Sequence, residues 1–358
     1  MMEKLEKLTR LISDGNHNAF TSMVRFRGAL YLSWRRSSGH AEQDGAIAAM
    51  RSFDDGQTWE ELTTPFSGKL NYYDGFLHAF KDRLLLYTSG YEIDDKPVWF
   101  KSSRAYASES RDGVRWSEPV EIQPSFPMHL WHPTNIGEYI YVAAYRIFRS
   151  GFQPWTWEVD LLRSQDGFKW ELVSELQRGG TGNEAALLED DGKLYAFIRN
   201  EGGSGHLTLR EAEAPYKQWS AETDFHASLQ GPVVAKVNGR RFLFGRYRAA
   251  SPRLGSSYID RGGTFMRCYV WVEELQLWAE YLSFPSGADC SYPAVVALDD
   301  QRMLVSYYSQ HDYLDQEGFK DMSGAADIYL AVVRTDALPE WGRVTSQTRA
   351  KLEGLGLL

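Results

Sequence analysis

Short apolar stretches bounded by polar turn residues recur along the whole chain. Aliphatic and aromatic residues predominate in runs such as residues 193–198, 241–244 and 328–333. Their short length and residue types are typical of β-strands. The pattern therefore predicts a chain built almost entirely of strands.

A turn motif punctuates these strands. Ser-Phe-Asp-Asp-Gly-Gln-Thr-Trp at residues 52–59 returns as Ser-x-Asp-Gly-x-x-Trp at residues 110–116 and 164–170. Asp and Ser side chains bond backbone amides and Gly supplies positive φ, so the motif predicts a hairpin turn with Trp opening the next strand. We interpret the aspartate of each copy as a turn residue: Asp54, Asp112 and Asp166.

The tryptophans keep this period along the chain. Trp59, Trp116, Trp170, Trp219, Trp278 and Trp341 are separated by 49 to 63 residues. Each interval holds about four predicted strands, which is the content of one propeller blade. The sequence thus predicts an all-β fold, a six-bladed β-propeller forming a single domain over residues 16–340. A tail follows at residues 341–358.

The first residues follow a different pattern. Leu5, Leu8 and Ile12 fall at helical spacing among charged residues, which predicts a short N-terminal helix within residues 1–15. This segment lacks the apolar centre of a secretory signal, and the chain has no run of about 20 apolar residues that would cross a membrane. We therefore expect a cytoplasmic protein without a membrane partner.

Composition narrows the function classes. Apolar residues make up 43% and aromatic residues 14% of the 358 residues, which excludes a disordered chain. The chain has 39 basic and 48 acidic residues, so it lacks the positive surplus with which proteins bind nucleic-acid phosphates. Cys268 and Cys290 are too few for a disulfide scaffold and are expected to be free thiols.

The turn motif is the Asp-box, and with it the chain resembles the sialidase (neuraminidase) superfamily. The resemblance is greatest to bacterial exo-sialidase-like Asp-box (BNR-repeat) propellers and spans residues 16–336, including His-Asn-Ala-Phe at 17–20 and Ser-Tyr-Pro at 291–293. It implies hydrolysis of a terminal acidic sugar at the central axis, where the innermost strands of the blades meet.

The fourth repeat carries the best match to the catalytic pattern. Glu184 stands at the start of one predicted strand, and Arg199, 15 residues later, ends the next. An arginine there can bind a substrate carboxylate bidentately. The resemblance makes Arg199 such a ligand and Glu184 the base beside the nucleophile.

Tyr292 in the sixth repeat resembles the tyrosine nucleophile of the family. A phenol has a pKa of about 10 and needs an adjacent base to react near neutral pH. The resemblance supplies Glu184 as that base, and a neutral tyrosine avoids repelling an anionic sugar. We assign the nearby Asp289 to substrate binding.

The arginine triad of the family is only partly matched. Arg246 corresponds by position to a second carboxylate-binding arginine, with Arg241 and Arg248 as neighbouring alternatives. The family's first arginine has no counterpart in residues 17–24, where Asn18 and His17 are the alternative contacts to the substrate. Each lost charge-assisted bond is worth about 1.5–3 kcal/mol, so the identity of the sugar stays open.

The segment after the first Trp-Arg-Arg strand resembles the family's acid/base segment. Asp44 is the leading general acid, with Glu42 and His40 as rivals, and Asp44-Gly45 is equally compatible with a simple turn. Arg35 and His40 are assigned to substrate binding, although Arg36 is an alternative to Arg35.

Two further regions are candidates for contact with the ligand. The resemblance places Asp74 in the pocket beside the substituents of the sugar ring. Residues 310–325 form either a lid over the axis or a plain surface insertion. His129, His132 and His311 lack the paired spacing of a metal site, so no metal is expected.

Together these assignments predict a retaining exo-glycosidase for sialic or a related ulosonic acid. Arg199 and Arg246 bind the carboxylate, Tyr292 attacks the anomeric carbon after Glu184 removes its proton, and Asp44 protonates the leaving oxygen and then activates water. Two alternatives stay open: a glycosidase or lyase acting on another sugar, and a non-catalytic glycan-binding propeller. The expected partner is a carbohydrate, and no cofactor is expected.

Overall fold

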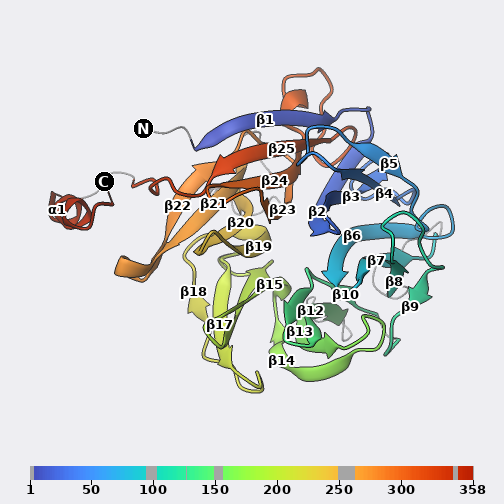
Figure 1. Cartoon of the computed structure of the whole chain (residues 1–358), viewed down its shortest axis with the longest axis horizontal. Helices are drawn as coiled ribbons and strands as arrows, with labels where there is room; N and C mark the ends of the chain where they lie inside the picture. The colour runs from blue at the N-terminus through green and yellow to red at the C-terminus, as the bar shows by residue number, and fades with distance from the viewer. Residues whose placement is uncertain are drawn as a thin grey trace.

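The computed structural model describes residues 4–93, 103–125, 127–148, 156–248, 263–341 and 346–357. Within these residues the strands form six antiparallel sheets around a central axis (Figure 1). The protein is therefore a six-bladed β-propeller, as the repeat predicts. Among the described residues, no helix has the length and apolar character needed to span a bilayer.

The blades follow one another along the chain. The first contains β2 (His17–Phe26), β3 (Ala29–Ser37), β4 (Ala46–Ser52) and β5 (Glu60–Leu62), and the second β6 (Asn71–Phe80), β7 (Arg83–Tyr91), β8 (Arg104–Ser110) and β9 (Val120–Glu121). The third contains β10 (His129–Leu130), β11 (Thr134–Ile136), β12 (Tyr139–Phe148), β13 (Thr156–Ser164) and β14 (Glu171–Gly180). The fourth contains β15 (Gly182–Asp190), β16 (Lys193–Asn200), β17 (Thr208–Glu213) and β18 (Thr223–Asp224).

The last two blades contain the C-terminal strands. The fifth contains β19 (Leu229–Val237), β20 (Arg240–Arg248), β21 (Thr264–Val272) and β22 (Leu277–Ser283). The sixth contains β23 (Cys290–Ala297), β24 (Arg302–Ser309), β25 (Asp327–Arg334) and, from the other end of the chain, β1 (Leu5–Ile12). Single-turn 3-10 helices occupy Glu273–Leu275 and His311–Tyr313, and helix α1 (Ser346–Gly354) lies in the C-terminal tail.

The predicted N-terminal helix is wrong, because residues 5–12 form strand β1. This strand pairs antiparallel with β25, with Leu8 opposite Ala331, and supplies the outer strand of the last blade (Figure 1). The propeller therefore begins at Leu5 rather than at residue 16. The first and last strands close the ring by pairing with each other.

The outer strands explain the tryptophan period. Trp59, Trp116, Trp170 and Trp219 stand shortly before β5, β9, β14 and β18, and Trp278 lies in β22. Trp341 keeps the same spacing after β25, although no outer strand follows it, because the outer strand of the last blade is β1.

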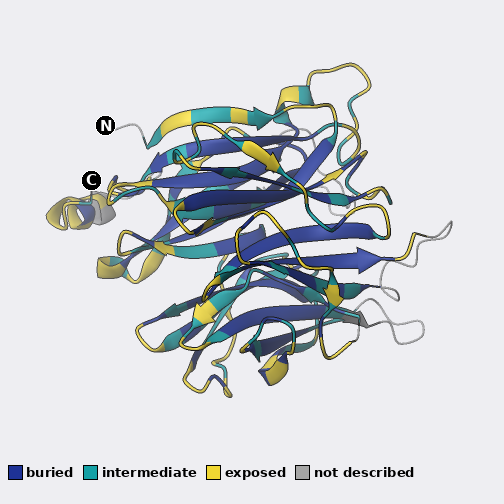
Figure 2. Ribbon diagram, turned by 45° about the vertical axis from the view of Figure 1, so that its right-hand side comes forward, coloured by how far each residue is buried: buried dark blue, intermediate teal, exposed yellow. Residues whose placement is uncertain are grey.

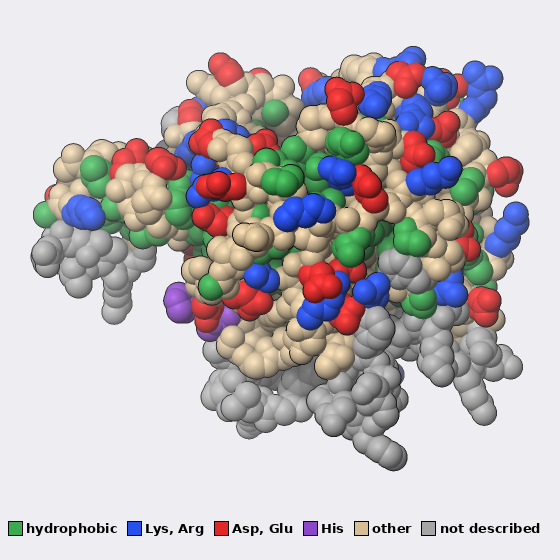
Figure 3. Space-filling model, turned by 90° about the horizontal axis from the view of Figure 1, so that it is seen from below, with side chains coloured by type: hydrophobic (Ala, Val, Ile, Leu, Met, Phe, Trp, Pro, Cys, Tyr) green, Lys and Arg blue, Asp and Glu red, His purple; other side chains and the backbone are tan. Residues whose placement is uncertain are grey.

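Burial is greatest in the inner strands and least in the outer loops (Figure 2). The surface seen in Figure 3 carries interspersed acidic and basic side chains.

The aspartate turns form as predicted at one end of the blades. Asp166 Oδ1 accepts the backbone N–H groups of Phe168 and Lys169, both at 2.8 Å, and Asp54 and Asp112 make equivalent bonds. At Gly113, with φ of 75°, an added Cβ would collide with the Tyr31 ring. In the first blade Ser52 lies opposite Leu30, whereas His17 lies opposite Ser37 at the other end of the sheet.

The innermost strands are irregular near their first residues. Five of them have a register shift that marks a β-bulge: Ala19–Ser22, Tyr73–Phe76, Gly182–Ala185, Gln230–Val233 and Ser291–Ala294. In the third blade the innermost strand is split into β10 and β11. Four bulges contain a residue with positive φ: Phe20, Asp74, Gly231 and Tyr292. Bulges re-aim side chains, and here they lie where neighbouring inner strands contact each other around the axis (Figure 1).

Candidate active site

Tyr292 and Glu184 form a hydrogen-bonded pair across the axis. The Tyr292 hydroxyl donates to Glu184 Oε1 at 2.5 Å, although the residues belong to different blades and are 108 positions apart. Gly231 N–H donates to the other carboxylate oxygen at 3.0 Å. Glu184 is 2% exposed, and Trp131 and Phe20 contact the Tyr292 ring with centroid separations of 5.1 and 4.6 Å.

Burial determines the protonation of this pair. It raises the pKa of Glu184 above its ordinary value, because Arg199 and the Tyr292 hydroxyl offset only part of the desolvation of the carboxylate. Burial and the adjacent carboxylates of Glu184 and Asp74 hold the pKa of Tyr292 well above its ordinary value. The resting pair is therefore a neutral phenol donating to a carboxylate with an increased affinity for protons.

Arg199 contacts the same carboxylate. Its Nη1 lies 2.6 Å from Glu184 Oε1, and its Nη2 lies 2.8 Å from Glu201 Oε1. Asn183 Nδ2 donates to the same Glu201 oxygen at 3.0 Å. The predicted hairpin thus brings Glu184 and Arg199 together, with Glu201 as a second acidic neighbour of the guanidinium.

Arg246 is held by two side-chain acceptors. Its Nε and Nη2 donate to Gln230 Oε1 at 3.0 and 2.8 Å, and its Nη1 donates to Asp289 Oδ1 at 3.1 Å. Arg199 disfavours the charged form of Arg246, which indicates that the two guanidinium groups act within one electrostatic neighbourhood. Arg199 thus contacts the reacting pair directly, and Arg246 is close enough to Arg199 for their charges to interact.

Asp289 is the most heavily bonded acid of the site. Its Oδ2 contacts His40 Nδ1 at 2.6 Å and His17 Nε2 at 3.1 Å, and its Oδ1 accepts from Tyr308 at 2.8 Å as well as from Arg246. The side chain is 0% exposed. Burial by itself opposes ionisation, but His40 and His17 outweigh it and hold the pKa of Asp289 well below its ordinary value. Asp289 therefore acts on its neighbours as a fixed buried anion.

The first blade places an aromatic ring, Phe20, against Tyr292. Asn18 is fully buried, accepts from Trp34 Nε1 at 2.9 Å and donates to Asp14 Oδ1 at 2.8 Å. Both ends of its side-chain amide therefore already bond to protein groups, and this geometry does not support the assignment of Asn18 to substrate binding. His17 is also fully buried, and Phe20 is the residue of this strand that contacts Tyr292.

The guanidinium of Arg35, assigned to substrate binding from the sequence, is 0% exposed, and each of its nitrogens donates to a protein oxygen. It donates to the carbonyl oxygens of Gly39, His40 and Glu42 at 3.0, 3.2 and 2.6 Å. It also lies 4.1 Å from the centroid of the Tyr73 ring. Arg35 therefore fixes the loop after β3 rather than a ligand.

Asp44 lies at an exposed turn of that loop. Both of its carboxylate oxygens lie 3.1 Å from the backbone N–H of Ser38. This geometry matches the turn interpretation of Asp44-Gly45. No hydrogen bond or ion pair joins Asp44 to the Tyr292–Glu184 pair within the described residues.

Asp74 lies on the axial side of the second blade. It is 5% exposed and has φ of 55° within its bulge, and its charge acts on both Tyr292 and Glu184. His129 Nδ1 lies 3.6 Å from Asp74 Oδ2. His129 Nε2 is 2.5 Å from the Tyr91 hydroxyl, and its ring stacks on Tyr145. Asp74 thus stays a candidate for substrate contact.

Residues 310–325 fold against the loop that carries His40. Met322 carbonyl accepts the His40 N–H at 3.0 Å, and Gly39 bridges to Ser323. Gln310 is fully buried and holds this segment by donating to the carbonyls of Ser323 and Ala325, both at 3.1 Å. The segment therefore packs beside the candidate site.

Several site residues were not identified from the sequence. Phe20, Glu201, Gln230, Tyr308 and the Gly231 amide all contact the residues named above. Only Gly231, a glycine beside a polar residue at the start of a predicted strand, gave a local signal. Of the other four, Phe20 depends on a partner in another blade, Tyr292, whereas Glu201, Gln230 and Tyr308 bind residues of their own blades.

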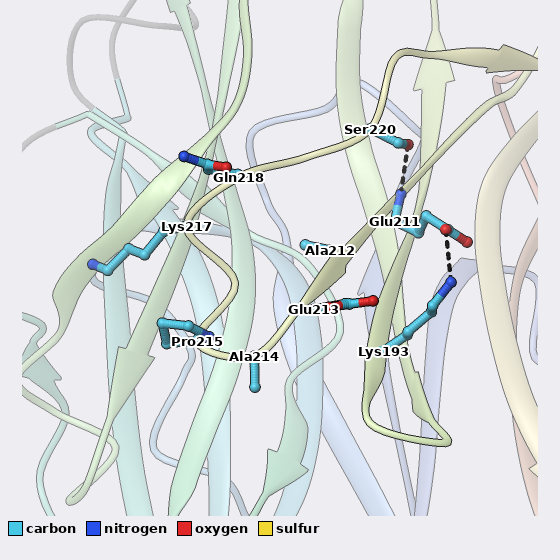
Figure 4. Close-up of a pocket in the computed structure, with 9 residues that line it drawn as sticks. All are labelled: Lys193, Glu211, Ala212, Glu213, Ala214, Pro215, Lys217, Gln218 and Ser220. Atoms are coloured by element: carbon cyan, nitrogen blue, oxygen red, sulfur yellow. Dashed lines mark hydrogen bonds and ion pairs between the residues drawn. The ribbon is translucent and has the colours of Figure 1, made fainter.

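Other clusters and hollows lie away from the reacting pair. Potential metal ligands group as His17, His40 and Asp289 and as His206, Asp224 and His226, rather than as the three histidines considered from the sequence. A shallow hollow of about 530 Å³ is lined by residues including Lys193, Glu211 and Lys217 (Figure 4). It lies where β16 begins, at the opposite end of the fourth blade from Glu184.

No protein-family model matches the sequence, and no curated protein matches it. Among solved structures, the fold is similar to a protein of unknown function from Dyadobacter fermentans, with a TM-score of 0.71, 19% identity, and coverage of 92% of this chain and 100% of that chain. It is also similar to the phage phi92 endosialidase, with a TM-score of 0.63, 14% identity, and coverage of 96% and 72%.

A Trypanosoma rangeli sialidase mutant displaying trans-sialidase activity is a further structural neighbour. Its TM-score is 0.60 at 12% identity, over 91% of this chain but only 58% of the sialidase. A related structure of the Trypanosoma rangeli sialidase contains a covalent 2,3-difluorosialic acid intermediate. These likenesses establish a sialidase-like propeller fold.

Proposed function

We propose that the protein is a retaining exo-glycosidase that removes a terminal acidic sugar, such as sialic or a related ulosonic acid. The observation that carries this proposal is the 2.5 Å hydrogen bond from the Tyr292 hydroxyl to the buried Glu184 carboxylate. A phenol is a useful nucleophile only when a base removes its proton during attack. The raised pKa of Glu184 suits that task.

The reaction has two displacements. In the first, the Tyr292 oxygen attacks the anomeric carbon, Glu184 takes the phenolic proton, and the bond to the leaving oxygen breaks as that oxygen is protonated. In the second, water replaces Tyr292 at the anomeric carbon, and Glu184 returns the proton to the phenol. Two inversions give net retention.

The arginines supply the affinity for an acidic sugar. Arg199 is held by Glu184 and Glu201, and Arg246 by Asp289 and by Gln230, the neighbour of the Gly231 that binds Glu184. A substrate carboxylate would exchange some of these internal bonds for its own charge-assisted bonds. The presence of internal acids also favours substrate release, because each guanidinium keeps a partner in the empty site.

The first test is a panel of fluorogenic aryl glycosides with sialosyl, ketodeoxyoctulosonyl, uronosyl and arabinosyl groups. We expect turnover of an acidic sugar, with retained configuration of the first product by NMR. A 2,3-difluoro analogue of the active sugar should add one glycosyl group to Tyr292, seen by intact-mass and peptide analysis. An inverted product, or a label on another residue, contradicts the mechanism.

Matched variants separate chemistry from folding. Tyr292→Phe should lose turnover and labelling. Tyr307→Phe is the control, because Tyr307 lies on neighbouring β24 but points its hydroxyl at the Pro285 carbonyl, 2.8 Å away in the blade core. Equal loss in both variants would show that the effect is not specific to the reacting pair.

One observation favours a second function. The first blade presents Phe20 rather than an arginine, and the described arginines of the site already have acidic partners. This arrangement also suits a hydrolase or lyase for another sugar. Turnover of an arabinosyl or uronosyl substrate alone would select it, whereas binding without turnover of any glycoside would indicate a glycan-binding propeller.

A further inference from the structure

We propose that His40, oriented by Asp289, is the acid and base that protonates the leaving oxygen and then activates water. The inference rests on the proposed glycosidase function and deepens it, since Tyr292 and Glu184 leave the proton of the leaving group unassigned. It also replaces Asp44, whose carboxylate is committed to the Ser38 amide at an exposed turn.

The contact with Asp289 orients the His40 imidazole. His40 Nδ1 lies 2.6 Å from Asp289 Oδ2, and that carboxylate is fully buried and ionised. The carboxylate therefore fixes the proton on Nδ1. Nε2, on the far edge of the imidazole, has no hydrogen-bond partner among the described residues. The His40 side chain is 22% exposed, whereas the other histidine on Asp289, His17, is 0% exposed.

His40 also lies close to the reacting pair. Its ring packs edge-on against Phe20 with centroids 5.2 Å apart, and Phe20 also contacts the Tyr292 ring, with centroids 4.6 Å apart. Phe20 thus contacts both side chains, which places His40 and Tyr292 in one aromatic cluster. A sugar whose anomeric carbon meets the Tyr292 hydroxyl would place its departing oxygen toward the His40 side chain.

The backbone around His40 is fixed on several sides. The Met322 carbonyl accepts its N–H at 3.0 Å, and Arg35 and the Tyr73 hydroxyl both donate to its carbonyl at 3.2 Å. Acid–base catalysis requires the transferring atom to be held in place, and these bonds hold the residue without using Nε2. The buried Arg35 thereby gains a role as a positioning residue.

The other histidine at the axis is less suited to the step. His129 Nε2 is 2.5 Å from the Tyr91 hydroxyl and 3.3 Å from Ser103 Oγ, and its ring stacks on Tyr145. Its other nitrogen faces Asp74 at 3.6 Å. His129 Nδ1 makes no hydrogen bond, but it is buried and faces the Asp74 carboxylate. The His40 side chain, by contrast, is 22% exposed.

His40 Nε2 loses one proton in the first displacement and regains one in the second. In the first displacement the His40 imidazolium gives its Nε2 proton to the leaving oxygen while the glycosidic bond breaks. In the second, neutral Nε2 accepts a proton from water as the water oxygen bonds to the anomeric carbon and the bond to Tyr292 breaks. The charged and titratable groups in contact with His40 are Asp289 and His17 at its ring and Arg35 and Tyr73 at its carbonyl, with Arg246 and Tyr308 bonded to Asp289.

The test compares His40→Asn with Asp44→Asn on two glycosides of the active sugar. Asparagine can keep a donor near the Nδ1 position but cannot transfer the proton. We expect His40→Asn to lower kcat/KM by about 10³-fold on an alkyl glycoside and by less than about 10-fold on an aryl glycoside, whose leaving group needs little protonation. Asp44→Asn should change neither by more than a few-fold.

Azide provides an independent readout. It attacks without needing a base, so it should restore turnover of the aryl glycoside by His40→Asn and give a glycosyl azide of retained configuration. Equal losses on both glycosides with no azide rescue would overturn the assignment, as would rescue of Asp44→Asn instead. Zn²⁺ bound at one equivalent by the wild type, with turnover abolished by a chelator, would instead make His17, His40 and Asp289 a metal site.

The controls distinguish this inference from the proposed function. Circular dichroism and thermal unfolding of His40→Asn should match the wild type, and its Tyr292 should still be labelled by the difluoro analogue. A wild type inert on every glycoside overturns the proposed function and this inference together. If the wild type is active but His40→Asn lowers kcat/KM equally on the alkyl and the aryl glycoside, this inference alone is overturned.

Discussion

Glu184 Oε1 receives two donors at once, the Tyr292 hydroxyl at 2.5 Å and Arg199 Nη1 at 2.6 Å. A carboxylate in this position has opposing tasks. It must stay ionised beside the guanidinium and still accept the phenolic proton during attack. Burial favours acceptance of the phenolic proton, because it raises the pKa of Glu184 despite the adjacent guanidinium of Arg199.

The first prediction is that the two residues act as one unit. Tyr292→Phe and Glu184→Gln should each lower kcat/KM on an aryl glycoside by about 10³-fold, and the double variant should lose little more than either alone. A double-mutant cycle measures the coupling. Additive losses, with the double variant about 10⁶-fold down, would mean that the two side chains act in separate steps.

The second prediction concerns pH. Glu184 works as a base only when ionised, so kcat/KM should rise with pH as this group loses its proton. Because the pKa of Glu184 is raised, the midpoint of this limb should lie above the 4.5 of an ordinary glutamate. In Glu184→Gln the residual activity should lack this limb. A midpoint at or below 4.5 would contradict the argument from burial.

The repeat architecture could be read from the sequence because its signals are local. The Asp turn, the following tryptophan and the short apolar runs each lie within a few residues. The N-terminal strand misled the same reasoning for a physical reason. Strand β1 has register shifts between Leu5 and Lys7 and between Arg10 and Ile12, and such bulges turn the alternation of a strand into a spacing that resembles a helix.

The site was predictable only where one hairpin or one short motif carries it. Glu184 and Arg199 share a hairpin, whereas Asp289 and His17 are 272 residues apart and their contact exists only once the ring has closed. The assignment of Arg35 to substrate binding depends on similar context. An arginine at a strand end looks the same in sequence whether it faces a ligand or, as here, the carbonyl groups of its own loop.

The third prediction is that Asp289→Asn destabilises the protein. It removes the anion shared by Arg246, His17 and His40 and leaves buried donors without it, which typically costs about 3–5 kcal/mol. Because the folded pKa of Asp289 is lowered, its stabilisation is present above the unfolded value of about 3.9 and is lost as pH falls through the folded pKa.

Urea unfolding of Asp289→Asn and the wild type at several pH values checks this. The difference in unfolding free energy should be constant from about pH 7 to pH 5 and should shrink below about pH 4. A difference that grows as the solution is acidified would have the wrong sign for a carboxylate with a lowered pKa.

The fourth prediction separates the aspartate turns from catalysis. Asp166→Ala removes the acceptor of two backbone N–H groups and should lower the free energy of unfolding by about 1–2 kcal/mol. The turn lies at the opposite end of the blades from Glu184, so kcat and KM should be unchanged at a temperature where the variant is folded. A tenfold loss of kcat in a fully folded Asp166→Ala would contradict a purely structural role.

The fifth prediction concerns closure of the ring by β1. Without residues 1–13 the last blade has only β23, β24 and β25, and the edge of β25 is left unpaired. Unpaired edges invite aggregation, and the apolar side chains under Leu5 and Leu8 become exposed. We expect the truncated chain to unfold at a lower temperature and to self-associate, as measured by scanning calorimetry and light scattering.

A synthetic peptide of residues 1–13 should reverse both effects, because it can occupy the vacant edge and stabilise the fold by mass action. The matched control is the same peptide with Leu8→Asp, which places a charge against the apolar residues beside β25 and should not rescue. Two results would argue against closure by this strand: a truncated chain as stable as the full one, or equal rescue by both peptides. In either case the stability of the last blade would have to come from the contacts of β23 with β2 and β19.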